Sequence, residues 1–526
     1  MSPSNDQMGA AGMPAGLFRS SLMIPLLIAT AQLAGQVIFH SNYGYFRDEL
    51  YYIACSDHLA FGYVDQPPLS IAILKVSRFL SGDSLQAIRF LPSLAGAGVV
   101  VLASLMARSL GGGRFAQGFA ALGVAAAHSL MGTGRYYSMN AFDVLFWAAA
   151  GYVVIRILAD ESPKLWILFG ALVGLGLLNK YSIGFLCIGL FAGLLLTSRR
   201  RHLASGRFWL GAGVAAFIFL PHIIWEIAHD FPSVEFMRNA SQEKNVSLSV
   251  LDFVSGQIRD INLFNLPVWL CGIYFFYAYR EGRFRSLAWM YATVFLVMVL
   301  AKAKVYYLAP IYPILLAGGA VFLESFFEKR GWKRIKLVYP FLLVASAIAF
   351  LPFALPVLPV DQFVRYQHAL GLTPHAEERS SVGELPQHYA DEFGWEEMTA
   401  TVAGVFKKLT PEEQSACVIY VRNYGEAGAI DFFGGKYGLP NALCGHNNYW
   451  LWGPGERTGD IAIIVGGSRD LQENFADLNR VYEHVELAGT TNARYAMPYE
   501  IGKQIFICKG MKTTFQKIWP GERFYI

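Results

Sequence analysis

Charge is scarce in this sequence, and its cysteines follow no recognisable pattern. Asp, Glu, Lys and Arg make up 16% of the 526 residues, whereas a soluble globular protein has about 25%. The six cysteines show no CxxC or other metal-type spacing. A net charge of +4 is too small to indicate a nucleic-acid partner. The shortage of charge, spread over many apolar blocks, predicts a polytopic α-helical membrane protein rather than one large soluble core.

About eleven apolar runs could cross a bilayer, for which a helix needs roughly 17–25 residues. The length of the first run predicts an uncleaved helix rather than a signal peptide. Two runs, at 264–279 and 287–301, are marginally short, and the boundary at "LLNKYS" is ambiguous. The runs lie near 21–39, 89–108, 115–132, 141–158, 165–181, 182–198, 208–227, 264–279, 287–301, 305–324 and 335–358.

Basic residues cluster in every second loop. The basic loops include "SRRRH" (198–202), "YREGRFR" (279–285) and "EKRGWKR" (328–334). Cytoplasmic loops of membrane proteins carry an excess of Lys and Arg. The pattern therefore predicts a cytoplasmic N-terminus, with the first long loop, 40–88, and the later loops 133–140 and 228–263 on the outer side.

The composition becomes ordinary and polar after Leu358. "ACVIYVRN" (416–423), "DIAIIVGG" (460–467) and "QIFICKG" (504–510) predict strands, and "EAGAIDFFGGKYG" (426–438) predicts a helix ended by glycine. Strands that alternate with short helices indicate an α/β domain. We therefore expect a transmembrane domain at 1–358 and, outside the membrane on the same side as loop 40–88, an α/β domain at 359–526.

Polar residues recur at the outer ends of the predicted helices. Ionisable groups at membrane depth are costly unless they are paired or face a wet cavity, so these positions are functional candidates. Carboxylates can accept a proton from an attacking hydroxyl, and Lys or Arg can hold a departing phosphate. The set includes Asp48, Glu49, Asp65, Arg135, Asp143, Lys180, His222, Lys302, Lys304 and Tyr306.

Each of these positions also has an ordinary structural interpretation. Asp48 and Glu49 could be solvated charges beside a helix end, and Arg135 could anchor at the headgroup level. Lys302 and Lys304 could snorkel from a turn, and the tyrosines could belong to an aromatic belt. His222 could be a buried histidine with a backbone partner. Their shared position on one face of the membrane favours a function over these ordinary interpretations.

Several ordered motifs resemble the polyprenyl-phosphate-sugar transferases of the GT-C superfamily, in particular glycosyltransferase family 39 and its bacterial relatives. The motifs are "FRDELYY", "GYVDQPPLS", "GRYYSMNAFDVLFW", "LGLLNKYSIGFL", "FLPHIIWEIAHDFPS", "KVYYLAPIYPILLAGGA", "RNYGEAGAIDFFGGKYGLP" and "GHNNYWLWGP". They cover nearly the whole chain. The resemblance implies a GT-C fold and a sugar donor carried on polyprenyl phosphate, of the undecaprenyl type.

The resemblance also implies roles for single residues. Asp48 would be the general base, with Glu49 orienting it, and Asp143 would shape the same cavity. Lys180 would contact the donor phosphate, and Arg135, Lys302, Lys304 and Tyr306 are weaker matches for that task. Asp65 and His222 could hold a divalent metal ion, although two ligands are too few for a site. Gln66 departs from the family pattern, because relatives often carry His or Lys before Pro67-Pro68.

From this resemblance we expect a monomeric enzyme of the bacterial inner membrane that faces the periplasm. It would pass the sugar, with inversion, to a glycolipid or glycan such as lipid A or lipopolysaccharide. Two alternatives remain: a transporter or flippase without transfer chemistry, and a non-catalytic membrane scaffold. Transporters usually show repeated halves and ionisable groups at mid-membrane depth, which this sequence does not show. A scaffold leaves the polar residues at successive helix ends unexplained.

Overall fold

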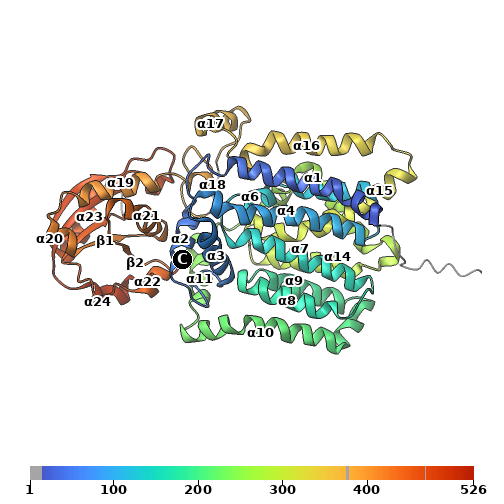
Figure 1. The fold of residues 1–526 in the computed structure, drawn as a ribbon, viewed down its shortest axis with the longest axis horizontal. Helices are drawn as coiled ribbons and strands as arrows, with labels where there is room; N and C mark the ends of the chain where they lie inside the picture. Colours follow the sequence, from blue (N-terminus) through green and yellow to red (C-terminus); the bar gives the residue numbers. More distant parts are fainter. Residues whose placement is uncertain (1–14, 375–377, 468–469) are drawn as a thin grey trace, which may run out of the picture.

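The computed structural model consists of a bundle of long helices joined to a smaller region built on a β-sheet (Figure 1). It describes residues 15–374, 378–467 and 470–526. The long helices lie side by side, and α10 (Gly206–Ala228) and α16 (Ile335–Ala354) form opposite edges of the bundle in this view. Shorter helices, among them α2 (Arg47–Asp57) and α3 (Leu69–Ser81), lie between the bundle and the sheet.

Six helices in the described part of the chain are long and apolar enough to cross a membrane. A bent pair, α9 (Ile183–Leu195) and η1 (Ser198–Ala204), would make a seventh span if it is counted as one. The six are α1 (Ala15–Phe39), α4 (Leu85–Ser109), α7 (Met139–Leu158), α10, η5 with α15 (Val305–Ile311 and Tyr312–Lys329) and α16. The chain is therefore a multi-pass membrane protein.

The other predicted spans are shorter helices or are divided. Three apolar helices of 10–17 residues correspond to predicted runs: α8 (Leu165–Asn179), η3 with α13 (Leu263–Asn265 and Leu266–Tyr277) and α14 (Arg285–Leu300). The run at 115–132 is split into α5 (Arg114–Ala125) and α6 (His128–Thr133). The count of about eleven crossings stays a prediction, because length alone does not decide whether a short helix crosses.

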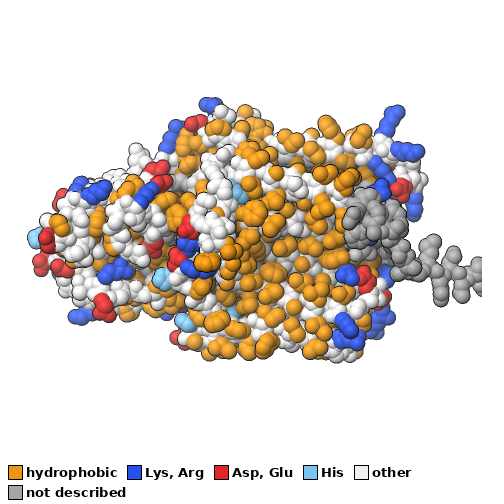
Figure 2. Space-filling model, viewed as in Figure 1, with side chains coloured by type: hydrophobic (Ala, Val, Ile, Leu, Met, Phe, Trp, Pro, Cys, Tyr) orange, Lys and Arg blue, Asp and Glu red, His pale blue; other side chains and the backbone are white. Residues whose placement is uncertain are grey.

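The surface of the bundle is apolar, as a lipid environment requires. Figure 2 shows hydrophobic side chains over the visible face of the bundle, whereas charged side chains gather on the sheet region. Lys and Arg side chains are also prominent at the end of the bundle farthest from the sheet. Only 17% of the spanning windows of α10 and α16 is buried inside the protein, so these helices present most of their surface outward.

Glycines allow some of the helices to pack closely. A Cβ atom on Gly170 of α8 would lie 2.0 Å from the carbonyl oxygen of Gly211 on α10. A Cβ atom on Gly211 would in turn lie 2.2 Å from the carbonyl oxygen of Trp166. Small residues at such contacts let backbones approach in a membrane, where hydrophobic association between helices is weak.

The first loop forms two helices. Helix α2 begins at Arg47, where the Glu49 side chain accepts a hydrogen bond from the Phe46 backbone N–H, 2.9 Å away; this is the reciprocal half of a capping box. Helix α3 begins directly after Pro67-Pro68, as the prolines predict. The loop before η3 adds α11 (Pro232–Asn239), η2 (Ala240–Lys244) and α12 (Val250–Asp260).

A mixed five-stranded sheet forms the centre of the C-terminal region, in the order β2-β1-β3-β5-β4. Strands β1, β2 and β3 are parallel, and β5 runs antiparallel to both β3 and β4. The strands are β1 (Cys417–Val421), β2 (Ala442–Cys444), β3 (Ile461–Val465), β4 (Tyr482–Thr490) and β5 (Gln504–Met511). The predicted strands at β1, β3 and β5 are confirmed, and so is the predicted helix, α21 (Tyr424–Phe433). Strands β2 and β4 were not predicted from the sequence.

Helices cover both faces of the sheet. They are α19 (Trp395–Phe406), α20 (Pro411–Ala416), α21, α22 (Asn448–Trp452), α23 (Leu471–Val481) and α24 (Phe515–Ile518). Two further helices, α17 (Val360–Ala369) and α18 (Gln387–Ala390), lie in the connection from the bundle. The remaining single turns are η4 (Tyr279–Gly282), η6 (Gly434–Tyr437), η7 (Pro498–Glu500) and η8 (Trp519–Glu522). Alternate residues of β1 enter different cores: Ile419 packs with α19, α21 and α2, whereas Val418 packs with the opposite layer. Helix α2 thus shares one hydrophobic core with the sheet region.

The carboxyl ends of β1 and β2 lie toward α2. Tyr424, directly after β1, bonds to Asp48, and the backbone N–H of Asn448, after β2, donates to the Tyr51 hydroxyl at 3.3 Å. Ligand sites in α/β sheets form beyond the carboxyl ends of the strands. The sheet therefore presents its chemically useful edge to the helix that carries Asp48.

Candidate functional site

Asp48 lies at the contact between the first loop and the sheet region. One of its carboxylate oxygens accepts a hydrogen bond from the Tyr424 hydroxyl, 2.9 Å away, and lies 3.5 Å from the Arg47 guanidinium. About a third of the side chain, 34%, is exposed. Asp48 is therefore held in place and remains reachable by a substrate hydroxyl, as a general base must be.

Glu49 points in a different direction, into the protein. Its carboxylate accepts hydrogen bonds from Arg89 at 2.9 and 2.7 Å and from the Tyr137 backbone N–H at 2.8 Å, and it is fully buried. No hydrogen bond joins it to Asp48 in the described part of the chain. It fixes the start of α2 against α4, so any effect on Asp48 passes through the position of the helix.

Arg135 is buried in an extension of the same network. It forms an ion pair with Glu392, donates to the His388 carbonyl at 3.0 Å, and lies over the Tyr389 ring. Glu392 also lies 3.4 Å from Arg89. Because its guanidinium is engaged in this way, the geometry gives Arg135 a role in joining the bundle to the sheet region rather than in contacting the donor.

Lys180 and Asp143, which the resemblance assigned to the same cavity, lie near each other. The Lys180 ammonium donates to Asn140 at 2.6 Å and lies 4.0 Å from the Asp143 carboxylate, which also accepts from Ser182 at 2.5 Å. The same ammonium lies 5.5 Å from the ring centre of Tyr306 and 5.0 Å from that of Tyr307. Cation–π contacts of this kind hold an ammonium in place.

Lys304 belongs to a separate group around Glu378. Its ammonium lies 3.3 Å from Glu378, and that of Lys244 lies 3.8 Å from it. Burial alone would raise the pKa of Glu378, but the nearby charges of Lys244, Arg47 and Lys304 outweigh burial and lower that pKa to about 2. Lys302, by contrast, is exposed in the turn after α14.

The Asp65 carboxyl interacts electrostatically with Asp48, which raises its pKa, and with Lys244, which lowers it. The Tyr51 hydroxyl donates to Asp65 at 3.0 Å, and burial raises the pKa of Asp65 to about 6. The neighbouring Gln66 is fully buried, and neither polar atom of its side chain has a hydrogen-bond partner.

The predicted metal residues do not form a metal site by themselves. The His222 ring donates from Nδ1 to the Phe61 carbonyl at 2.8 Å, and its Nε2 atom is hydrogen-bonded to the Tyr181 hydroxyl at 2.6 Å. The described residues contain no group of three or more His, Cys, Asp or Glu side chains that could hold a metal ion. Both ring nitrogens are engaged, so the geometry does not fit the expected metal, which stays a prediction.

Arg47, Lys244, Glu378 and Tyr424 were not among the predicted site residues. Arg47 adjoins Asp48 in "FRDEL", and Tyr424 lies in the quoted motif "RNYGEAG", so both carried a signal. Lys244 and Glu378 carried none, because only the fold brings the 228–263 loop and the connection after α17 next to α2.

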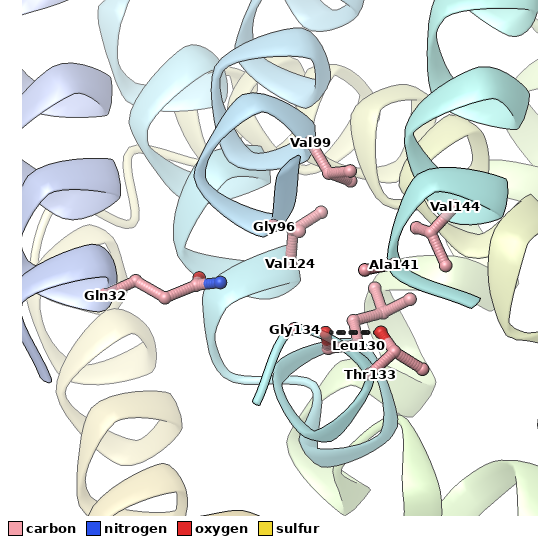
Figure 3. Close-up of a pocket in the computed structure, with 9 residues that line it drawn as sticks. All are labelled: Gln32, Gly96, Val99, Val124, Leu130, Thr133, Gly134, Ala141 and Val144. Carbon is pink, nitrogen blue, oxygen red and sulfur yellow. Dashed lines mark hydrogen bonds between the residues drawn. The ribbon is translucent and has the colours of Figure 1, made fainter. Parts of the chain in front are cut away.

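Two hollows lie apart from the residues just described. A void of about 10 Å³ inside the bundle is lined by nine residues, and Gln32 of α1 points toward it (Figure 3). It has room for about one water molecule. A surface hollow of about 440 Å³ lies along α11 and is lined by Asp230, Phe231, Val234, Glu235, Arg238 and Asn239.

Comparison with known proteins gives matches in sequence. Residues 65–225 match the model of the dolichyl-phosphate-mannose-protein mannosyltransferase family. The lipid A galacturonosyltransferase RgtD of Rhizobium johnstonii is 25% identical over 270 residues, which are 50% of this chain and 56% of that protein. The chain thus matches little more than half the length of this curated relative.

Solved structures match over almost the entire chain. ArnT from Cupriavidus metallidurans bound to undecaprenyl phosphate has a TM-score of 0.55 and 15% identity, with 94% of this chain and 98% of that chain covered. The apo structure of ArnT gives a TM-score of 0.56 at 14% identity, with the same coverage. Over nearly its whole length this protein therefore has a fold of the ArnT type, and its residues 65–225 are similar in sequence to the dolichyl-phosphate-mannose-protein mannosyltransferase family.

Proposed function

We propose that this protein is a membrane glycosyltransferase that takes a sugar from a polyprenyl-phosphate donor. The observation that carries the proposal is the position of Asp48, a partly exposed carboxylate held by Tyr424 where the bundle meets the sheet region. Two similarities support it: a relative described as a lipid A galacturonosyltransferase, and an ArnT structure that contains undecaprenyl phosphate.

The proposed reaction is a single displacement. Asp48 accepts the proton of the acceptor hydroxyl while the acceptor oxygen forms a bond to the anomeric carbon. The bond between that carbon and the phosphate oxygen breaks, and the polyprenyl phosphate leaves with the electron pair. Attack opposite to the leaving group inverts the anomeric centre. Lys180, Lys304 and Tyr306 lie on the same side of the bundle and are proposed to meet the charge that develops on the phosphate.

The acceptor is proposed to be a glycolipid or glycan of the cell envelope, such as lipid A. We place the sheet region on the periplasmic face of the inner membrane and the basic end of the bundle in the cytoplasm. The Lys and Arg side chains at the end of the bundle opposite the sheet support this orientation. We propose that the protein acts as a monomer.

Replacement of Asp48 by Asn tests the proposal. A general base contributes about 10²–10⁴-fold to a rate, so Asp48→Asn should lower sugar transfer by at least about 10²-fold. The asparagine side chain keeps the shape of the site, so thermal stability and binding of undecaprenyl phosphate should persist. The measurement is single-turnover transfer by detergent-purified protein, with polyprenyl-phosphate sugars as donors and lipid A as acceptor.

Asp57→Asn is the matched control. Asp57 lies on the same helix, but its carboxylate is exposed and pairs with Lys75 and Arg78 at 2.8 and 2.9 Å. This variant should transfer sugar at the wild-type rate. Full turnover by a folded Asp48→Asn protein would overturn the assignment of Asp48.

A further inference from the structure

Three cationic side chains surround one carboxylate beside Asp48. The ammonium groups of Lys304 and Lys244 lie 3.3 and 3.8 Å from one oxygen of Glu378, and the Arg47 guanidinium lies 3.9 Å from the other. All four side chains are at most 18% exposed. Four segments of the chain that are distant in sequence therefore meet at a single anionic group.

Glu378 reaches this position from the connection between α17 and α18. The connection is fastened to the turn of η2: the Arg379 backbone N–H donates to the Lys244 carbonyl at 2.8 Å, and the Arg379 guanidinium donates to the Gln242 and Asn245 carbonyls at 2.6 and 3.1 Å. An isolated β-bridge joins Asn245 and Glu378. Gln387 of α18 also donates to the Glu378 carboxylate at 3.1 Å. Among the described residues, movement of this segment would break these hydrogen bonds and ion pairs but none within a helix or between the strands of the sheet.

The charges of the group do not balance without Glu378. Arg47 also lies 3.5 Å from Asp48 and 3.7 Å from Asp391, but in the described part of the chain Glu378 is the one carboxylate within 4 Å of Lys244 and Lys304. Buried charges need a partner of opposite sign. If Glu378 moved away, the Lys244 and Lys304 ammonium groups would lose this carboxylate, and another anion would be favoured in its place.

The group is also where a departing anion would need stabilisation. Arg47 directly precedes the proposed base, and Lys244 acts on the charges of both Asp48 and Asp65. Cations arranged around one point bind phosphate and carboxylate oxygens by charge-assisted hydrogen bonds. Tyr306 lies two residues from Lys304 and next to Lys180, so this group continues into the residues already proposed for the donor.

We propose that Arg47, Lys244 and Lys304 form an anion site for the lipid-linked donor, and that Glu378 is its built-in occupant, which an anionic oxygen group of the donor displaces. This inference rests on the proposed function. While the site holds no lipid, Glu378 keeps the three cations paired. The donor must compete with Glu378 for these cations when it binds. On arrival of the donor the 378–380 segment moves off the turn of η2.

Binding of undecaprenyl phosphate to the purified full-length protein tests the site. Glu378→Gln removes the competing charge and should tighten binding by about tenfold or more. Lys244→Gln and Lys304→Gln should each weaken it by a similar factor. Arg379→Ala, which loosens the segment without touching the cations, should also tighten binding. Glu384→Gln is the control, because Glu384 lies in the same connection but pairs with the exposed Arg494.

A second comparison separates the two possible sources of the anion. If the gain in Glu378→Gln is the same for bare undecaprenyl phosphate and for the lipid bearing a neutral or a uronic acid sugar, the phosphate fills the site. If the gain is confined to the lipid with a uronic acid, the sugar carboxylate fills it. Both results support the anion site.

The proposal is overturned if Glu378→Gln and Arg379→Ala bind every lipid as the wild type does, or if the Lys244 and Lys304 variants lose no affinity. Thermal unfolding of each variant shows whether it is folded, and the Arg379 variant keeps the test decisive should Glu378→Gln misfold. Binding does not require transfer. A protein that shows these affinity changes but transfers no sugar keeps the anion site and loses the proposed function.

Discussion

Neighbouring acidic residues in this protein serve different purposes because their surroundings differ. Asp48 and Glu49 are adjacent in α2, yet Asp48 remains partly exposed beside Tyr424 while Glu49 is buried against Arg89. Asp57, at the end of the same helix, forms exposed pairs with Lys75 and Arg78. Exposed pairs of this kind contribute little to stability. Only Asp48 combines a fixed position with access.

Asp391 gives a prediction about pH. Its side chain is 1% exposed, and burial raises its pKa to about 7 even though Arg47 lies 3.7 Å away. Between about pH 4 and pH 7 the folded protein holds a proton that the unfolded chain releases. The contribution of Asp391 to stability therefore falls as the pH rises through this range.

Asp391→Asn should remove this dependence. The melting temperature of the variant minus that of the wild type should be larger at pH 8 than at pH 5. Thermal unfolding of detergent-purified protein at the two values measures the difference, with Asp477→Asn on the exposed face of α23 as control. A difference between variant and wild type that is the same at both pH values would contradict the interpretation.

Helices in the bundle depend on backbone contacts as well as on side chains. The contact of α8 with α10 brings Gly170 and Gly211 together, and neither position has room for a Cβ atom. The elements that hold the site depend instead on buried charge: Glu49, Arg89, Glu392 and Arg135 join α2, α4 and the connection to the sheet. Loss of one partner of such a network leaves an uncompensated buried charge.

Two glycines of α10 provide a matched pair of substitutions. Gly211→Ala should destabilise the protein by about 1–3 kcal/mol, the usual cost of overpacking, because the new Cβ atom would lie 2.2 Å from the Trp166 carbonyl oxygen. Gly213→Ala, two residues away, meets nothing within 4 Å and should leave stability unchanged or slightly higher. Thermal unfolding in detergent compares them; equal melting temperatures would argue against close packing of α8 on α10.

The whole molecule has a polar end and a basic end with an apolar bundle between them (Figure 2). The sheet region does not have a core of its own on the side that faces the bundle, since α2 residues such as Leu50 and Ile53 complete that core. This arrangement holds the carboxyl edge of the sheet against the proposed base. A sheet region that drifted away would expose apolar surface.

Labelling of introduced cysteines tests the orientation in the membrane. Asn492, in the sheet region, and Lys329, at the end of α15, are both exposed, whereas all six natural cysteines lie in buried or half-buried positions. A membrane-impermeant maleimide should label Asn492→Cys in spheroplasts and should label Lys329→Cys only after the membrane is opened. The cysteine content of the wild type gives the background. The reverse pattern would invert the proposed topology.

Much of the architecture follows from local sequence patterns. Long apolar runs such as those of α4 and α16 can satisfy their backbone only as helices in lipid, and they are present. Strands β1, β3 and β5 are buried apolar runs and were predicted, whereas β4 (Tyr482–Thr490) is a largely exposed edge strand with charged residues and gave no clear signal. The three residues of β2 are too few for periodicity to be recognised.

The sequence by itself determined the class of protein, its helical bundle and the identity of the acidic residues near its first loop, because these depend on local composition and on motifs. Only the tertiary structure decided which of those residues face one another. In the folded protein Glu49 and Arg135 belong to a buried network of ion pairs, and Lys244 and Glu378 lie near Arg47. Such contacts join residues far apart in the chain, and their energies depend on burial and geometry that no local pattern records.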